Sequence, residues 1–358
     1  MDERSFELGG AGLPVPRLAP LVARLDDVGI VEHARGATPV PDFGHCAEDA
    51  GRALGLAALL SSDPDAEVVS SACLRQLERS LRSDGQFTLR LDAVGNPTED
   101  GCSDDATARA LWGLANAATG ALGSVVMRRA ERLLSAAAGF ESPHPRAAAH
   151  AVLAGAALVS ADPRSTIGRR LVDANSAQVP RPARSGSWLW PEPRLAYGNG
   201  LLCEALLETG WIRCDDERVD EALSLLRWLE DIERSPAGHF SFTPTGGRGP
   251  GDTERFDQQP IEAWTLASAC RKAYEITADP WWQDVTAQIA AWFAGANDLG
   301  IMMWDPTTGA SFDGLTADGV NANQGTESTL ALIGTLWVAS ATAEIGRASC
   351  RERVCYPV

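Results

Sequence analysis

Apolar residues recur along most of the chain at the three- and four-residue spacing of α-helices, and strand-like alternation is scarce. One segment has the pattern of a helix with a single buried side, because Ala222, Leu225 and Leu229 share a stripe and charged residues fill the opposite side. The segment 329–342 is apolar nearly all round, as in a helix with neighbours on every side. The pattern therefore predicts an all-α protein with inner and outer helices.

Short Asp-Pro links join several of the predicted helices into antiparallel pairs, as in Ser62–Asp65, Ala161–Pro163 and Ala278–Pro280. Twelve helices make six hairpins, so the predicted fold class is all-α, an (α/α)6 toroid of six helical hairpins. The predicted helices span residues 17–26, 46–61, 66–83, 104–119, 123–139, 145–160, 164–176, 193–209, 216–232, 258–277, 280–296 and 323–343.

The toroid is predicted to be one domain over residues 17–343, preceded by a loose leader over residues 1–16. Residues 344–358 differ from the rest, because they break the apolar helix pattern and add Cys350 and Cys355. This segment looks like the translation of a sequencing adapter joined to a truncated gene. We therefore expect a non-native tail and exclude it from fold reasoning. A natural polar tail is the alternative.

The long links between the predicted hairpins carry carboxylates, carboxamides and indoles, and a ring of hairpins would bring these links to one face. Sugars require this mixture, because hydroxyls pair with carboxylate and amide groups and C–H faces rest on aromatic rings. Cleavage of a glycosidic bond requires two carboxyl groups. We predict that the catalytic carboxylates are Asp257, Glu327, Glu192 and Asp105, with acid and base roles unassigned. The predicted substrate-binding residues are Asp49, Trp190, Tyr197, Asn199, Gln258, Gln259, Glu262, Asp298, Trp304, Asn321, Asn323 and Gln324.

A structural role is the alternative for each single acid in this set. Asp104, Asp257 and Asn323 each lie where a predicted helix begins. Short polar side chains at such positions cap free N–H groups, and acids there also favour the helix dipole. The cluster as a whole favours function.

Charge and composition exclude several other classes of protein. The net charge is −17, so the surface would repel nucleic acid and anionic lipid. We expect no membrane span, and a cytoplasmic location, because the chain has no apolar run of membrane length and no signal-peptide pattern at its start. The cysteines form no C-x-x-C pair and the histidines are scattered, so no metal site and no cofactor are expected. All basic residues except Lys272 are arginines, which we attribute to coding bias.

Two segments, Phe256–Ala263 (FDQQPIEA) and Val320–Thr329 (VNANQGTEST), together with weaker matches such as Gly44–Leu54 and Ser103–Asp105, resemble a bacterial family. This is the family of six-hairpin, glycosidase-like (α/α)6 toroid proteins, whose members occur alone or joined to glycosyltransferase domains. The resemblance covers residues 17–343. It implies a carbohydrate-active enzyme with an oligosaccharide or glycoconjugate as partner. A glycosyltransferase is a further partner that it implies.

Three motifs at the predicted rim depart from the family pattern, at His45, Ala47, Glu48, Ala50, Gly51, Thr107, Gly198 and Leu201. These departures leave three hypotheses open. The first is an enzyme of the glycoside hydrolase kind that acts with paired carboxylates. The second is a non-catalytic glycan-binding or accessory module of a glycosyltransferase. The third is an epimerase-like enzyme, and the absence of a well-placed rim histidine pair counts against it.

Overall fold

The structure is a computed structural model that describes residues 7–8, 11–98, 101–183 and 186–345. The predicted leader lies partly, and the predicted tail almost wholly, outside these residues. The chain divides into two compact units. Unit 1 comprises residues 1–16, 180–323 and 331–358, and unit 2 comprises residues 17–179 and 324–330. The single domain over residues 17–343 stays a prediction.

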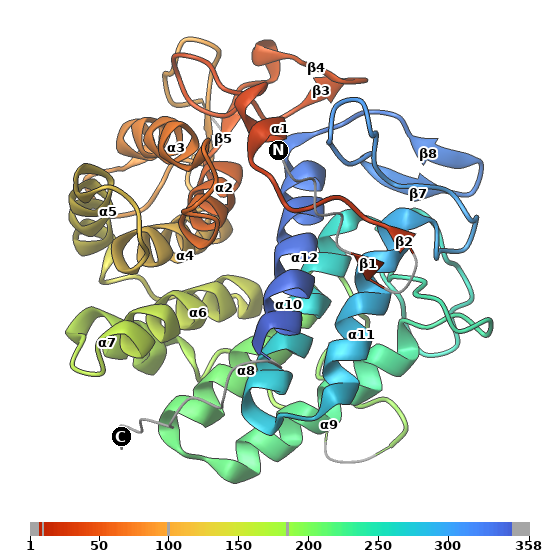
Figure 1. The fold of residues 1–358 in the computed structure, drawn as a ribbon. Coiled ribbons are helices and arrows are strands. Elements are labelled where there is room, and N and C mark those ends of the chain that lie inside the picture. Colours follow the sequence, from red (N-terminus) through yellow and green to blue (C-terminus); the bar gives the residue numbers. More distant parts are fainter. Residues whose placement is uncertain (1–6, 9–10, 99–100, 184–185, 346–358) are drawn as a thin grey trace. The chain divides into compact units, whose positions relative to one another are not determined.

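Unit 2 consists of helices in an inner and an outer row. The inner helices α2, α4 and α6 pack side by side, and the outer helices α3, α5 and α7 each cover one of them (Figure 1). The bounds are α1 (Ala19–Val22), α2 (Ala47–Leu59), α3 (Ala66–Ser80), α4 (Asp104–Thr119), α5 (Ser124–Ala137), α6 (Pro145–Ala161) and α7 (Thr166–Asn175).

Glycine permits the close approach of the inner helices α2 and α4. A Cβ atom on Gly113 of α4 would lie 2.1 Å from the carbonyl oxygen of Gly51 on α2. A Cβ atom on Gly51 would lie 2.5 Å from the carbonyl oxygen of Arg109. Both distances are shorter than any real carbon–oxygen contact, so the two backbones touch directly here. This contact also brings the first turns of α2 and α4 together.

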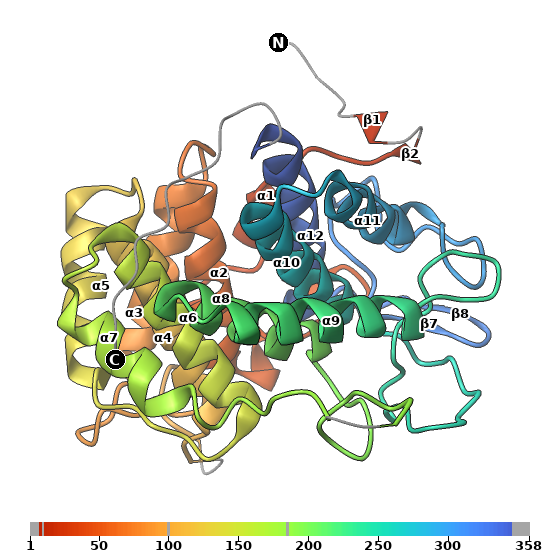
Figure 2. The same cartoon turned by 90° about the horizontal axis from the view of Figure 1, so that it is seen from below.

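Unit 1 repeats the inner and outer arrangement with α8 (Asn199–Arg213), α9 (Asp216–Ile232), α10 (Pro260–Thr277) and α11 (Pro280–Ala291). The inner helices α8 and α10 pack on each other, α9 covers α8, and α11 covers α10 (Figure 2). Helix α12 (Thr326–Ile345) begins with residues of unit 2, and its residues from 331 onward belong to unit 1. Within unit 1, Gly334 of α12 lies directly against the ring of Trp264 on α10.

Strands are short; β1 and β2 precede the first helix, and the others lie in links between helices. The described residues contain four antiparallel pairs: β1 (Glu7–Leu8) with β2 (Ala11–Gly12), β3 (Ala34–Arg35) with β4 (Thr38–Pro39), β5 (His45–Cys46) with β6 (Arg90–Leu91), and β7 (Gly314–Thr316) with β8 (Gly319–Asn321). Two 3-10 turns, η1 (Pro41–Phe43) and η2 (Trp292–Ala294), complete the set. None of the described helices combines the length and apolar composition needed to cross a bilayer.

Two predicted helices differ from the observed helices at both ends. The helix predicted over 17–26 is only the four-residue α1, because the chain reverses at Asp26, whose N–H donates to the carbonyl of Gly29 at 2.9 Å. The helix predicted over 193–209 begins at Asn199 and ends at Arg213. Leu195 pairs instead with Arg248, and Gly198 is left-handed with φ of 59°, so neither residue can belong to the helix.

Candidate functional site

Carboxylates gather at the first turns of α2, α4 and α12 in unit 2. Glu48 and Asp49 lie in the first turn of α2, Asp105 in that of α4 and Glu327 in that of α12. Arg52, one turn further along α2, contacts three of them. Its Nη1 lies 3.0 Å from Asp49 Oδ1, and its Nη2 lies 2.8 Å from Glu327 Oε2 and 3.7 Å from Glu48 Oε2.

Arg109 on α4 extends the same network. Its Nη1 lies 2.8 Å from Glu48 Oε2 and 3.3 Å from Asp105 Oδ2. The spacing along each helix explains the arrangement, because residues three or four apart lie on the same side of a helix. Glu48 contacts both arginines and so links the two halves. We call this set the two-arginine cluster; it consists of Glu48, Asp49, Arg52, Asp105, Arg109 and Glu327.

Burial divides the two-arginine cluster into an inner and an outer part. Arg52, Arg109 and Asp49 are buried, whereas the side chains of Asp105 and Glu327 are 23% and 43% exposed. Burial raises the pKa of Asp49 well above its usual range, although the ion pair with Arg52 opposes that rise. Burial lowers the pKa of Arg52, but Glu327, Asp49 and Glu48 outweigh it and raise that pKa. The buried guanidinium groups of Arg52 and Arg109 therefore hold the partly exposed carboxylates of Glu327 and Asp105.

His150 on α6 is a further group of this region. Its Nδ1 lies 3.1 Å from the carbonyl oxygen of Arg146, one turn earlier. A carbonyl only accepts, so Nδ1 carries the proton and Nε2 carries a lone pair. Burial, followed by the charge of Arg109, lowers the pKa of His150 to about 3, although Asp105 opposes this. The imidazole is therefore neutral, and the described residues provide no hydrogen bond to Nε2.

The predicted substrate-binding residue Gln324 also lies in unit 2. It is buried, and its backbone is held on both sides. Its N–H donates to the carbonyl of Gly36 at 3.0 Å, and its carbonyl accepts from Arg24 Nη2 at 2.6 Å. These bonds fix the backbone just before Thr326 and Glu327, where α12 begins.

In unit 1, Glu262 and Asn199 hold the start of α8. Glu262 Oε1 accepts from the N–H of Gly198 at 2.6 Å, and its Oε2 accepts from the N–H and side-chain amide of Asn199, both at 3.2 Å. Both residues are buried. A carboxylate with this set of partners caps a helix N-terminus from another helix.

Gln258 and Asp298 form the second polar cluster of unit 1. Gln258 is buried; it donates to Asp298 Oδ2 at 2.6 Å and accepts from the indole of Trp292 at 3.1 Å. Asp298 Oδ1 also lies 3.2 Å from His239 Nε2 and 3.1 Å from Arg255 Nη1. Burial raises the pKa of Asp298, but hydrogen bonds from Ser241, Gln258 and His239 outweigh it and lower that pKa. These two side chains tie the link before α10 to the link after η2.

Trp190 has a different role from the predicted one. Its side chain is 1% exposed, its ring stacks on that of Trp228 with centroids 6.5 Å apart, and its Nε1 donates to Glu192 Oε2 at 3.2 Å. A ring this deeply buried presents no face to a sugar, so Trp190 packs the link before α8. The predicted catalytic residue Glu192 accepts that bond.

The other predicted residues of unit 1 vary in exposure. The side chain of Asp257 is exposed, as are those of Tyr197, Asn321 and Asn323, whereas Gln259 and Trp304 are half-buried. Unit 2 therefore brings together Asp49, Asp105 and Glu327, and unit 1 holds the remaining residues except Gln324. The catalytic and binding roles of all of them stay predictions.

A separate charged group joins α8 and α10 inside unit 1. The single lysine of the chain, Lys272, is 8% exposed, and its Nζ lies 2.8 Å from Glu208 Oε1 and 3.6 Å from Glu275 Oε2. Burial, reinforced by the charge of Glu208, raises the pKa of the neighbouring Glu204 to about 8. None of these residues was predicted from the sequence as part of a site.

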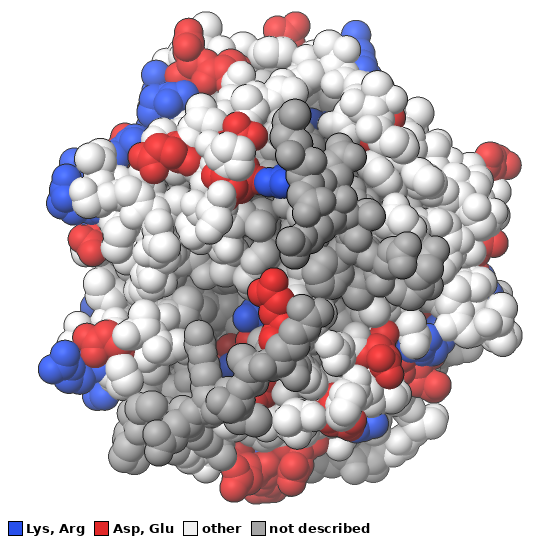
Figure 3. Space-filling view, in the orientation of Figure 1, with Lys and Arg blue, Asp and Glu red and all other residues white. Residues whose placement is uncertain are grey.

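Charge on the surface is mixed where it can be followed. On the face drawn in Figure 3, acidic and basic side chains lie beside one another at several places. The described residues of this face form no continuous basic field of the kind that binds a phosphate backbone.

Comparison with known proteins defines the fold. No protein-family model matches the chain. No curated protein matches it in sequence. Among solved structures, cellobiose 2-epimerase from Bacillus thermoamylovorans B4167 is similar with a TM-score of 0.69 and 14% identity, over 92% of this chain and 96% of that one. The chain has the six-hairpin (α/α)6 toroid fold.

Two further structures support this toroid fold. A D-mannose isomerase has a TM-score of 0.64 and 14% identity, over 89% of this chain and 94% of that one. A family 76 glycoside hydrolase (mannosidase) from Bacteroides thetaiotaomicron VPI-5482 has a TM-score of 0.58 and 10% identity, over 92% and 97%. The fold class predicted from the sequence is confirmed, and these toroid neighbours are carbohydrate-active enzymes. An association with a glycosyltransferase stays a prediction.

Proposed function

We propose that the protein is a carbohydrate-active enzyme that acts on a glycosidic bond of an oligosaccharide or glycoconjugate, with Glu327 and Asp105 as its reacting carboxylates. The observation that carries the proposal is the two-arginine cluster. It holds two partly exposed carboxylates from different helices on the buried arginines Arg52 and Arg109, which Glu48 links to each other. The activities of the toroid neighbours agree with a sugar substrate.

The geometry suggests how the reaction would be divided. Glycoside cleavage needs one carboxylic acid to protonate the leaving oxygen and one carboxylate to activate water or attack the sugar carbon. Glu327 Oε2 already accepts from Arg52 at 2.8 Å, so we assign it the role of base or nucleophile. Asp105 makes the longer of the two contacts, 3.3 Å to Arg109, so we assign it the role of acid. Arg52 and Arg109 touch these carboxylates rather than react, and so act as positioning residues.

His150 favours a second candidate function, the epimerisation or isomerisation of a free sugar. Such a reaction removes a proton from the carbon next to a carbonyl and stabilises the resulting negative oxygen. His150 offers a neutral ring with a lone pair on Nε2, and the charges of Arg109 and Arg52 act on it. One histidine supplies one proton-transfer group, so a carboxylate of the cluster would serve as the other.

The test is turnover of a panel of oligosaccharides and reducing disaccharides, analysed for both hydrolysis and isomerised products. We expect Glu327→Gln and Asp105→Asn to lower kcat by about 10²- to 10⁴-fold while sugar binding is retained. Glu78→Gln is the matched control, because Glu78 also pairs with an arginine of unit 2, at 2.9 Å from Arg129, but on the outer helices.

The outcomes separate the candidate functions. Hydrolysis that needs Glu327 and Asp105 supports the glycosidase proposal, and isomerised sugar that is lost in His150→Gln supports the second. Sugar binding without turnover by the wild-type protein would leave the non-catalytic glycan-binding module. Equal losses in Glu78→Gln and Glu327→Gln would show that general instability, and not the cluster, explains the effect.

A further inference from the structure

Phe43 is unusual among the aromatic residues of this protein because its ring is open to solvent. Its side chain is 47% exposed, and in the described part of the chain only Tyr197, at 44%, is comparable among the aromatic residues. Isolated exposed apolar side chains are common and carry no meaning by themselves. The surroundings of Phe43 therefore decide whether its exposure has a role.

The backbone fixes the position of Phe43 firmly. The N–H of Phe43 donates to the carbonyl of Val40 at 3.1 Å, and the N–H of Gly44 donates to that of Pro41 at 2.8 Å. Gly44 has a φ of 87°, and a Cβ atom there would lie 2.4 Å from the carbonyl oxygen of Leu91. Only glycine satisfies both conditions. The exposed ring is thus presented on a fixed turn and does not lie on a loose loop.

Two polar side chains flank the ring. The ring of His33 meets that of Phe43 edge-on, with centroids 5.3 Å apart, and the guanidinium carbon of Arg35 lies 5.9 Å from the Phe43 centroid. His33 Nε2 lies 3.3 Å from Glu32 Oε1, and Glu32 is held by two bonds from Arg90 at 2.6 and 2.7 Å. No carboxylate among the described residues pairs with Arg35. We call His33, Arg35 and Phe43 the Phe43 platform.

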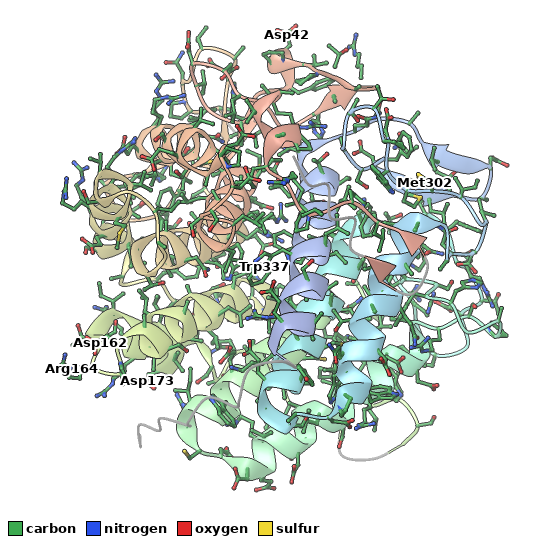
Figure 4. The ribbon with its side chains drawn as sticks, viewed as in Figure 1. Asp42, Asp162, Arg164, Asp173, Met302 and Trp337 are labelled. Carbon is green, nitrogen blue, oxygen red and sulfur yellow. The ribbon has the colours of Figure 1, made fainter. Side chains whose placement is uncertain are left out.

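The segment that leads into His33 is hydrogen-bonded to the start of α12. The N–H of Thr326 donates to the carbonyl of Glu32 at 3.0 Å, and its hydroxyl donates to that of Val31 at 2.5 Å. Thr326 is the residue before Glu327. Asp42, next to Phe43 in the chain, lies at the upper edge of the ribbon in Figure 4.

We propose that the Phe43 platform is a stacking subsite for a second sugar unit of the oligosaccharide, beside the unit that reacts at Glu327. The C–H face of a pyranose would rest on the ring of Phe43, and its hydroxyls would bond to His33 and Arg35. An aromatic face between polar side chains is the chemistry that a sugar ring requires. This inference rests on the proposed function, because it extends the same site.

The experiment measures binding by calorimetry in the full chain carrying Glu327→Gln, so that turnover does not consume the ligand. We expect Phe43→Ala to weaken oligosaccharide binding about tenfold and to leave monosaccharide binding unchanged. Phe43→Trp should retain or improve oligosaccharide binding, because it keeps an aromatic face. Phe43→Leu, which keeps an apolar side chain without that face, should resemble Phe43→Ala. Val68→Ala is the matched control, because Val68 is 48% exposed on the outer helix α3.

Each result bears on one proposal. Equal oligosaccharide affinity in Phe43→Ala, Phe43→Trp and the parent overturns the platform, and so does equal weakening of mono- and oligosaccharide binding. Absence of any oligosaccharide binding by the parent overturns it as well. Binding that depends on Phe43, in a wild-type protein that shows no turnover, keeps the platform and overturns only the catalytic proposal.

Discussion

Glu327 in unit 2 and Glu262 in unit 1 both occupy the first turn of a helix, yet their surroundings differ. Glu262 is buried and accepts hydrogen bonds from the backbone of Gly198 and Asn199. Glu327 is partly open, and its ion pair is with a side chain, that of Arg52. The first arrangement completes a helix end, and the second leaves carboxylate oxygen accessible. The kind of partner therefore distinguishes a structural acid from a candidate reacting one, whereas position along the helix does not.

The largest effect is expected for Arg52→Met in unit 2. This change removes the cation that faces buried Asp49 and leaves an uncompensated acidic group, which costs about 3–5 kcal/mol of unfolding free energy. Urea unfolding measures the loss. The double variant Asp49→Asn with Arg52→Met should recover part of it, because the buried charge is then gone. A loss below about 1 kcal/mol in the single variant would mean that the cluster is not desolvated as described.

A direct comparison of the two glutamates gives the next effect. Glu262→Gln should lower the free energy of unfolding by about 1.5–3 kcal/mol, because charged hydrogen bonds to buried N–H groups are weakened. Glu327→Gln should change stability by less than about 1 kcal/mol, because its side chain is 43% exposed. Both are measured by urea unfolding at the same pH. The proposed difference between a structural Glu262 and a more open Glu327 is wrong if Glu327→Gln proves the more destabilising change.

His150 gives the smallest effect near neutral pH, where its imidazole is uncharged in the folded protein and mostly uncharged in the unfolded chain. Its pKa in the folded protein is about 3, below the ordinary value of 6.5, so the unfolded chain binds the proton more readily. Stability should therefore fall as the pH drops from about 6.5 towards 3, by up to about 1.4 kcal/mol per pH unit. His150→Gln should flatten this part of the profile of melting temperature against pH. Identical profiles for the two proteins would show that the imidazole is not held neutral.

The hydrophobic pattern predicted most of the helices because burial on one side of a helix imposes its period on the sequence. Residues 216–232 were predicted at both ends, since a clear amphipathic stripe runs through them. The errors in helix ends occur where contacts between residues distant in sequence determine the backbone conformation. The pairing of Leu195 with Arg248, residues that are distant in sequence, delays the start of α8, and no local signal reveals it.

Asp49, Asp105 and Glu327 of the two-arginine cluster were predicted as site residues, but Glu48 and the two arginines were not. Arg52 and Arg109 were assigned to coding bias, although Asp49 precedes Arg52 by three residues and Asp105 precedes Arg109 by four. That spacing was a usable signal, because it places each pair on one side of a helix. No sequence signal of this kind indicates that Trp190 is buried, since indoles in a link have the same sequence pattern whether they pack inward or face a ligand.

The side chain of Lys272 can report the separation of helix α10 from helix α8. Because it is the single lysine and is buried between carboxylates on α8 and α10, its amine is shielded from reagents while these helices stay together. An acylating reagent followed by peptide mass spectrometry would thus record, at one side chain, how often α10 separates from α8. Ligand binding that stabilises unit 1 would register as slower acylation, without any label having been introduced.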